Sequence, residues 1–175
     1  MTNGYSEHSW SLPPILDISA LAEQVPTAIA QVLAKRGIDT TQKLNALVDP
    51  PHKLPYDPLR ISGMDIALRR IYSAINNQER VGVFGDFDVY GITGTAIISE
   101  GLSSFGIPVT PYLPHRVDEG HGLSNAAIDA LADDGVTLII TVDCGITSFD
   151  EVNYAKSRGV EVIITDHHLP QDGVP

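Results

Sequence analysis

The stretch VFGDFDVYGITGTA, residues 83–96, decides which fold we expect for this chain. It begins inside a short apolar run, RVGVFGD at residues 80–86, which is typical of a buried strand. The run ends in two aspartates, Asp86 and Asp88, and the small residues that follow favour a helix over about 92–104. A buried strand that leads into a helix is the first half of a βαβ unit.

The same alternation continues to the end of the chain. We expect further strands and helices, in turn, over residues 107–114, 125–135, 136–143, 148–159 and 160–166. Continuous apolar runs that alternate with helices indicate a parallel sheet covered on both faces. We therefore predict an α/β fold over residues 78–175, a doubly wound and mostly parallel, Rossmann-like sheet.

Residues 1–77 are expected to form an N-terminal arm and a helical lead-in. Residues 17–37 are helical in composition, with Pro26 expected to break or start a helix and Gly37 to close one, and Asp39 or Thr40 is suited to cap a short helix after them. Residues 50–63 contain four prolines and are expected to be a loop. An amphipathic helix is expected over 64–77.

Composition limits the classes of function. The 175 residues include 22 acidic and 11 basic side chains, which gives a net charge of −11. This charge argues against a broad electrostatic hold on nucleic acid, and it is compatible with the binding of metal cations. Cys144 is the single cysteine, so we expect no disulfide and a reducing, cytoplasmic setting. No run reaches the roughly 18 apolar residues of a membrane span. The first ten residues lack the pattern of a secretory signal, so we expect no membrane partner.

Acids and imidazoles follow three of the four expected strands. They are Asp86 and Asp88 after the first, Asp143 after the third, and Asp166, His167 and His168 after the fourth. Ligands of an open parallel sheet bind beyond these strand ends, where neighbouring carboxylates repel one another unless cations lie between them. Mixed Asp and His ligands suit Mn²⁺, Zn²⁺ or iron, whereas Mg²⁺ binds imidazole less readily.

This placement predicts metal-dependent hydrolysis of a phosphate ester. Two cations about 4 Å apart would activate water and stabilise the attacking and leaving oxygens of a phosphoryl displacement. Gly91, Gly94 and Gly145 leave room for the backbone to approach a phosphate, and helix N-termini at this edge favour anions.

Four segments carry a resemblance to a known family. GDFDVYGITGTA, PHRVDEGHGLS, TVDCGITS and ITDHH, which begin at residues 85, 114, 141 and 164, resemble in order and spacing the N-terminal motifs of the DHH phosphoesterase superfamily. The likeness is greatest to the RecJ branch, the single-strand-specific 5′→3′ DNA exonucleases of bacterial repair and recombination, and runs from about residue 15 to the end. It implies a hydrolase that uses a pair of Mn²⁺ or Mg²⁺ ions on single-stranded DNA.

The resemblance also assigns roles to residues. Its metal ligands fall on Asp88, the bridging Asp143 and His167, with Asp86 as the first aspartate of its motif and Asp166 and His168 beside the histidine ligand. We therefore expect catalytic roles for Asp88, Asp143, His167 and His168, and metal binding by Asp86, Asp88, Asp143, Asp166 and His167. Substrate contacts are expected at Gly91, Thr93, Arg116, Gly122, Ser124 and Gly145. Arg116, Glu119, Gly120 and Gly122 match the second motif.

The chain departs from the family's pattern at three points. The third aspartate of the first motif falls on Tyr90, either a tuned substitution or the lesion of a decaying gene, and a neutral phenol is a poor substitute for a carboxylate. His121 stands where RecJ proteins usually have tyrosine. The chain ends at Pro175, whereas RecJ proteins continue with a further aspartate ligand and more DNA-binding surface. We therefore expect this polypeptide to be weak or inactive in catalysis.

Plainer alternatives exist for the same residues. Asp86 and Asp88 could simply cap a helix, as aspartates often do. His167 and His168 could be a pair of surface histidines. Asp143 could be a turn residue before Gly145. Arg116 could pair with Asp118 or Glu119 rather than a phosphate. Cys144 is expected to be a small buried residue.

Three other functions compete with the nuclease. DFDVYGIT also looks like the Asp-x-Asp motif of haloacid-dehalogenase-type phosphatases, but that class needs a lysine and a later acid pair where this chain has histidines. A catalytically inactive scaffold of the same superfamily would explain Tyr90. A small-nucleotide phosphodiesterase is the remaining alternative, although such members usually begin near the first strand.

Overall fold

The structure, a computed structural model, describes residues 14–49, 56–171 and 173–175. The chain divides into two compact units, residues 1–57 and residues 58–175. Within the described part, no helix is both long enough and apolar enough to cross a membrane.

The first unit holds two short helices, α1 (Thr27–Lys35) and α2 (Thr41–Val48). Thr40 caps α2, because its side chain accepts a hydrogen bond from the Lys43 N–H. Leu21, Ala30 and Leu44 form a small core of their own. Helix α1 begins directly after Pro26, the residue expected to break or start a helix within residues 17–37.

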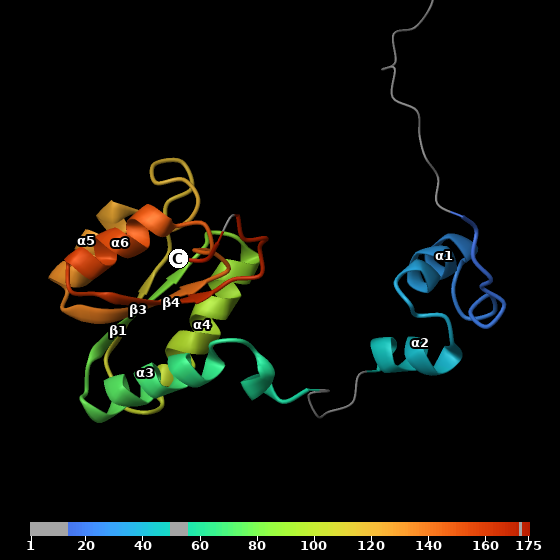
Figure 1. Cartoon of the computed structure of the whole chain (residues 1–175), viewed down its shortest axis with the longest axis horizontal. Helices are drawn as coiled ribbons and strands as arrows, with labels where there is room; N and C mark the ends of the chain where they lie inside the picture. The colour runs from blue at the N-terminus through green and yellow to red at the C-terminus, as the bar shows by residue number, and fades with distance from the viewer. Residues whose placement is uncertain (1–13, 50–55, 172) are drawn as a thin grey trace, which may run out of the picture. The chain divides into compact units, whose positions relative to one another are not determined.

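The second unit is a four-stranded parallel sheet with helices on both faces (Figure 1). Its strands are β1 (Arg80–Gly85), β2 (Val109–Tyr112), β3 (Val136–Val142) and β4 (Glu161–Thr165). The spatial order is β2-β1-β3-β4, and all three pairings are parallel. The predicted doubly wound α/β fold is therefore confirmed.

Two helices cover each face of this sheet (Figure 1). One face carries α3 (Met64–Asn76) and α4 (Val89–Ser103), and the other carries α5 (Asn125–Asp133) and α6 (Phe149–Ser157). A single turn of 3₁₀-helix, η1 (Pro58–Arg60), precedes α3 within the segment expected to be a loop. Residues 50–55 of that segment lie outside the described residues.

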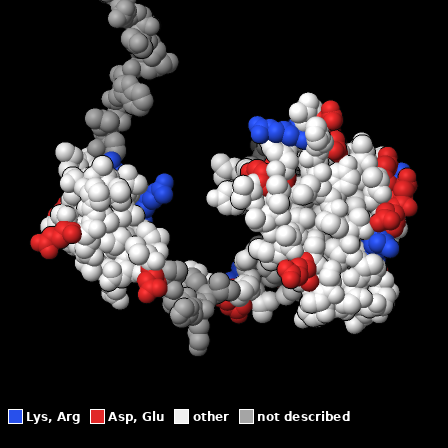
Figure 2. Space-filling model, turned by 180° about the vertical axis from the view of Figure 1, so that it is seen from behind, with Lys and Arg blue, Asp and Glu red and all other residues white. Residues whose placement is uncertain are grey.

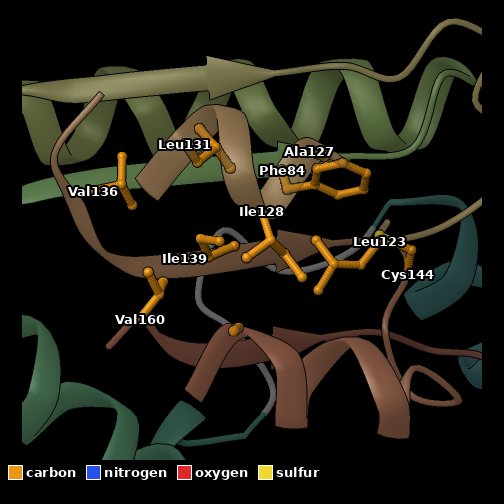
Figure 3. Packing of buried hydrophobic residues seen from close by; sticks show 10 residues of the cluster. Phe84, Leu123, Ala127, Ile128, Leu131, Val136, Ile139, Cys144 and Val160 are labelled. Atoms are coloured by element: carbon orange, nitrogen blue, oxygen red, sulfur yellow. The ribbon is translucent and has the colours of Figure 1, made fainter. Parts of the chain in front are cut away.

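Alternate residues of the strands serve the two faces. Val81 and Val83 of β1 pack with α3 and α4, whereas Phe84 packs with α5 and α6. Figure 3 shows the hydrophobic cluster on the face that α5 and α6 cover, where Ile128 and Leu131 of α5 lie against Ile139 of β3. Because the central strands β1 and β3 are buried on both faces, they are almost continuously apolar, whereas the edge strands β2 and β4 are only partly buried.

Two boundaries differ from those expected. Residue 78 was expected to begin the α/β domain, but the compact unit already begins at Pro58, because Ala74 of α3 is fully buried in the core of the sheet. Helix α4 begins at Val89 rather than near residue 92, because the Asp88 side chain accepts hydrogen bonds from the N–H groups of Tyr90 and Gly91.

Helix α4 approaches the sheet so closely that one of its glycines has no room for a side chain. A Cβ added at Gly91 would lie 2.2 Å from the backbone oxygen of Asp86, whereas one added at Gly101, in the same helix, would meet nothing within 4 Å. We expect Gly91→Ala to lower the free energy of unfolding by about 1–3 kcal/mol or more through overpacking. Gly101→Ala should raise it by about 0.5–1 kcal/mol through helix propensity. Urea denaturation measures both, and equal effects would contradict this packing.

A second feature of the fold is an ionic network at the edge of the sheet where the strands begin. Arg70 of α3 donates to Glu79 at 2.7 Å and also contacts Glu161 of β4. Glu79 accepts a further hydrogen bond from the Thr137 hydroxyl of β3 at 2.6 Å. The hydrogen bond from Arg70, supported by Thr137, holds the pKa of Glu79 below its usual value. The network therefore ties α3 to two strands.

The lowered pKa of Glu79 predicts a pH-dependent contribution to stability. Because the folded-state pKa lies below the unfolded value near 4.5, the stabilisation is complete above that pH and is lost as the pH falls through the folded-state pKa. We expect Glu79→Gln to cost about 1–3 kcal/mol of unfolding free energy at pH 7 and less in acid, by denaturant titration at several pH values. Glu100→Gln, a change at an exposed position of α4, serves as the control and should show no such trend.

Candidate metal centre

The acids and histidines singled out in the sequence gather where the winding of the sheet reverses. Strands β1 and β3 are neighbours, and the chain leaves β1 for α4 on one face and β3 for α6 on the other (Figure 1). Such a switch point is where open α/β sheets bind ligands. Asp86 and Asp88 follow β1, Asp143 follows β3, and Asp166 follows β4.

Asp143 combines an unusual backbone with an unsatisfied side chain. Its φ of 62° lies in the left-handed region, which costs energy for a residue other than glycine. Its N–H donates to the Thr165 carbonyl oxygen at 2.9 Å, which fixes it beside β4. Its side chain is only 8% exposed, and its buried Oδ1 has no hydrogen-bond partner among the described residues. A buried carboxylate oxygen in this state is poised for a cation.

Asp166 fixes the two histidines that follow it. Its Oδ1 accepts hydrogen bonds from the N–H groups of His167 and His168 and from His168 Nδ1 at 2.7 Å, while Oδ2 accepts from the Ile146 N–H. Burial alone would raise the pKa of Asp166, but the backbone hydrogen bonds of His168 and Ile146 outweigh it and lower the pKa. The charged carboxylate orients His168 and leaves its Nε2 available.

Asp143, His167 and His168 form a three-donor cluster. One potential ligand atom from each lies within 4.8 Å of the other two. His167 Nε2 is 2.8 Å from Asp143 Oδ1 without the alignment of a hydrogen bond. An oxygen donor with two imidazoles suits Mn²⁺, Zn²⁺ or iron, so these residues fit a divalent cation. The hydrogen bond from His168 to Asp166, together with the charge of that acid, raises the His168 pKa, so a cation competes with a proton there.

Asp86 and Asp88 lie at the same edge but outside this cluster. Asp86 Oδ1 accepts the Phe87 N–H at 2.8 Å, and Oδ2 lies 3.4 Å from His121 Nδ1. Asp88 caps α4, and its pKa is lowered by the hydrogen bonds from the N–H groups of Gly91 and Tyr90, which outweigh burial. The capping alternative thus describes Asp88 in this structure. Within the described residues, the expected pair of metal sites is represented by one three-donor cluster.

Tyr90 occupies the first turn of α4 beside the cluster. Its side chain is exposed, and its ring centre lies 6.5 Å from that of His167. The phenol therefore stands near the expected metal ligands without filling the space between them.

A cavity of about 240 Å³ opens beside the cluster. It is lined by Asp86, His121, Gly122, Asp143, Cys144, Gly145, Ile146, Thr147, Ser148, Asp166 and His168. Burial, aided by the nearby charges of Asp86 and Asp166, raises the pKa of the Cys144 thiol to about 12. The thiol is therefore protonated at neutral pH, as expected for a small buried residue rather than a ligand.

The expected substrate-contacting residues fall into two groups. Gly122 and Gly145 line the cavity. The side chains of Thr93 and Ser124 are instead used locally, because the Thr93 hydroxyl donates to the Val89 carbonyl and Ser124 caps α5. Gly91 packs against the backbone of Asp86.

Arg116 is exposed on the loop that follows β2. Its guanidinium lies over the Phe87 ring, 5.0 Å from the ring centre. The two acids proposed as its partners are engaged elsewhere. Asp118 pairs with His115, and Glu119 accepts from the Tyr112 hydroxyl.

Sequence reasoning missed two supports of the site. The Ile146 N–H holds Asp166, and no side-chain signal announces a backbone donor. The Tyr112 hydroxyl, at the end of β2, holds Glu119 at 2.6 Å and so anchors the loop that carries Arg116. The polar end of an otherwise apolar strand was the available signal for Tyr112.

Residues 80–175 match the model of the DHH family, N-terminal domain. The single-stranded-DNA-specific exonuclease RecJ of Bacillus subtilis (strain 168) is 37% identical over 160 residues, which are 90% of this chain and 20% of that protein. The chain spans between 20% and 27% of the length of the first curated relatives that it matches.

Two solved structures are similar to this fold. A crystal structure of exonuclease RecJ bound to manganese has a TM-score of 0.64 and 39% identity, covering 69% of this chain and 31% of that one. A crystal structure of RecJ from Thermus thermophilus in complex with Mn²⁺ has a TM-score of 0.63 and 31% identity, covering 95% of this chain and 23% of that one.

The buried Asp143 carboxylate, whose Oδ1 accepts no hydrogen bond within the described residues, is expected to bind metal at a cost to the stability of the metal-free chain. Mn²⁺ at a hundredfold excess over Kd should stabilise the wild-type chain by about 2.7 kcal/mol. Asp143→Asn should abolish this gain, yet should not lower the Tm without metal, because an amide is less costly to bury than a carboxylate whose Oδ1 accepts no hydrogen bond. Asp133→Asn, an equal charge change at the far end of α5, should respond to Mn²⁺ like the wild type. The Tm of each variant is measured by thermal unfolding with and without Mn²⁺. A wild-type Tm that Mn²⁺ does not raise would refute the metal site.

Proposed function

The chain belongs to the DHH family, and on this premise we propose that its α/β unit is the cation-binding part of a RecJ-type phosphodiester hydrolase. The observation that carries the proposal is the buried Asp143 Oδ1, which lacks a hydrogen bond beside His167 and His168. The substrate that we propose is single-stranded DNA, degraded from its 5′ end in DNA repair and recombination. The likeness to RecJ proteins named as single-stranded-DNA-specific exonucleases supports this choice.

In this proposal each residue has a limited task. Asp143, His167 and His168 hold Mn²⁺ or Mg²⁺, which when bound lowers the pKa of water and polarises a phosphoryl oxygen. Asp166 orients His168 through Nδ1. The backbone at Gly122 and Gly145 gives a phosphate room to enter the cavity.

Arg116 is the residue we propose to contact the DNA phosphate. The Phe87 ring holds its guanidinium near the cavity, since His121, which stacks on the same ring, lines that cavity. On the face shown in Figure 2, the Lys and Arg side chains of the described residues form no continuous surface. Together with the net charge of −11, this favours a grip on the strand end at the cavity over a broad electrostatic hold.

We propose further that Tyr90 weakens catalysis. A carboxylate at this position would stand in the first turn of α4 beside His167, where the exposed phenol now lies. A phenol keeps its proton to about pH 10, so at neutral pH it is a much weaker ligand for a cation than a carboxylate is. The alternatives, an inactive scaffold or a small-nucleotide phosphodiesterase, are separated from the nuclease by the same experiment.

Replacing Tyr90 tests this proposal directly. Tyr90→Asp should tighten Mn²⁺ binding about ten- to a hundredfold and increase the release of nucleotides from 5′-labelled single-stranded DNA. Isothermal titration and a nuclease assay measure the two effects. Tyr72→Asp, the same change at an exposed position of α3, should alter neither.

Each alternative gives its own result in these assays. Tighter Mn²⁺ binding with cleavage of a dinucleotide but not of the DNA strand would indicate the small-nucleotide enzyme. Unchanged Mn²⁺ affinity and no cleavage in Tyr90→Asp would favour the scaffold and contradict the nuclease.

A further inference from the structure

The helix that follows β3 begins at the cavity without a side-chain cap. Helix α6 starts at Phe149, and Ser148 stands at its N-cap position, but the Ser148 side chain accepts no hydrogen bond from the first turn. The first N–H groups of a helix have no intrahelical acceptor, so they need a partner from elsewhere. Because Ser148 lines the cavity, a bound ligand can be that partner.

The other two helices that follow strand ends at this edge of the sheet satisfy their own first turns. Asp88 accepts the N–H groups of Tyr90 and Gly91 at the start of α4, and its charge also repels an anion. The Ser124 hydroxyl accepts the Ala127 N–H at the start of α5. Among these three helices, and within the described residues, the first turn of α6 is the one that a ligand can complete.

The Ser148 hydroxyl is a second and independent sign of a ligand. Ser148 is only 9% exposed, and its side chain makes no hydrogen bond within the described residues. A buried hydroxyl without a partner costs free energy, so such groups in proteins are generally completed by water, an ion or a ligand. The cavity is the open side from which that partner can reach Ser148.

The turn that carries Ser148 is held in place by its surroundings. The Ile146 N–H donates to Asp166 Oδ2 at 3.0 Å, and the Ser148 N–H donates to the Gly145 carbonyl oxygen at 3.0 Å. Gly145 has a φ of 108°, and a Cβ added there would lie 2.9 Å from the Thr141 hydroxyl, so the turn lies directly against β3. The donors at the start of α6 are therefore positioned before any ligand arrives.

We infer that the Ser148 hydroxyl and the first N–H groups of α6 bind a phosphate oxygen of the substrate. The inference rests on the proposed function, because it adds a substrate contact to the same cavity. A hydroxyl and helix N-terminal N–H groups are hydrogen-bond donors to phosphate, and the positive end of the helix dipole favours its charge. Ser148 is thus a substrate-binding residue that does not ligate the cation.

The phosphate contact depends on the cation. Asp143 and Asp166 line the cavity, and Asp150 and Glu151 lie in the first turn of α6 itself. These four carboxylates oppose an anion, and one hydroxyl with a helix N-terminus does not offset them. A divalent cation reverses the local field, so the phosphate binds only when the cation is present.

Removal of one hydroxyl tests the contact. Ser148→Ala deletes the proposed donor without deleting a helix cap, because the Ser148 side chain caps nothing. Ser157→Ala is the matched control at the other end of α6, where the Ser157 hydroxyl donates to the Tyr154 carbonyl oxygen. Both variants and the wild-type chain are titrated calorimetrically with Mn²⁺. They are then titrated, with and without saturating Mn²⁺, with thymidine 5′-monophosphate and with thymidine, which lacks the phosphate.

We expect the Mn²⁺-loaded wild type to bind the nucleotide and not the nucleoside, and the metal-free chain to bind neither. Ser148→Ala should weaken nucleotide binding about ten- to a hundredfold, because the lost hydrogen bond is made to a charged group. Its Mn²⁺ affinity should change less than about twofold, and its metal-free Tm should equal that of the wild type, since a hydroxyl that caps nothing contributes little to folding. Ser157→Ala should bind the nucleotide like the wild type.

Other results overturn the inference, and they differ in what they say of the proposed function. If the wild type takes up Mn²⁺ but Ser148→Ala binds the nucleotide equally well, or if neither chain binds it, the contact is lost and the proposed cation site stands. Absence of Mn²⁺ uptake by the wild type removes both. Equal binding of thymidine would assign the affinity to the base. A metal-free Tm of Ser148→Ala well below that of Ser157→Ala would give the hydroxyl a structural role instead.

Discussion

The site depends on one constraint, the crowding of carboxylates where parallel strands end side by side. Asp86 and Asp143 follow neighbouring positions of β1 and β3, and Asp166 follows β4 on the other side of β3. Backbone N–H groups and His168 satisfy Asp166, but Asp143 Oδ1 accepts no hydrogen bond within the described residues and has only His167 Nε2 beside it, at 2.8 Å. A buried carboxylate oxygen without a partner costs free energy, and a cation removes that cost.

The fold maintains the backbone of this arrangement through close packing and backbone hydrogen bonds. A Cβ at Gly91 or at Gly85 would collide with the facing element, so α4 presses against β1 directly below Asp86. The backbone of Asp143 is held in its left-handed conformation by the hydrogen bond of its N–H to Thr165. The ionic network around Arg70 and Glu79 ties the opposite edge of the sheet. The ionic network thus stabilises the sheet where its strands begin, and the candidate site lies where they end.

The sequence allowed the sheet to be predicted, because apolar runs buried on both faces leave an unambiguous signal. It also brought together Asp143, His167 and His168, since residues that follow parallel strands must share an edge. It placed the start of α4 near residue 92 rather than at Val89, although capping by Asp88 was one of the alternatives, and it did not predict the local use of Ser124. It anticipated a turn at Asp143 only as an alternative, although aspartate adopts the left-handed φ more readily than most residues, and it could not predict the Ile146 donor, which is a backbone group.

The acidity of the site links the cation to the proposed substrate. A phosphate that entered the cavity without a cation would meet Asp86, Asp143 and Asp166, and at a low effective dielectric this repulsion would exceed what one exposed arginine could offset. The histidines do not remove the conflict, because the charge of Asp166 already neutralises His168 when it is protonated. A divalent cation reverses the sign of the local field and also provides the partner that Asp143 lacks. The buried Asp143 carboxylate, whose Oδ1 accepts no hydrogen bond within the described residues, would therefore make anion binding conditional on the metal.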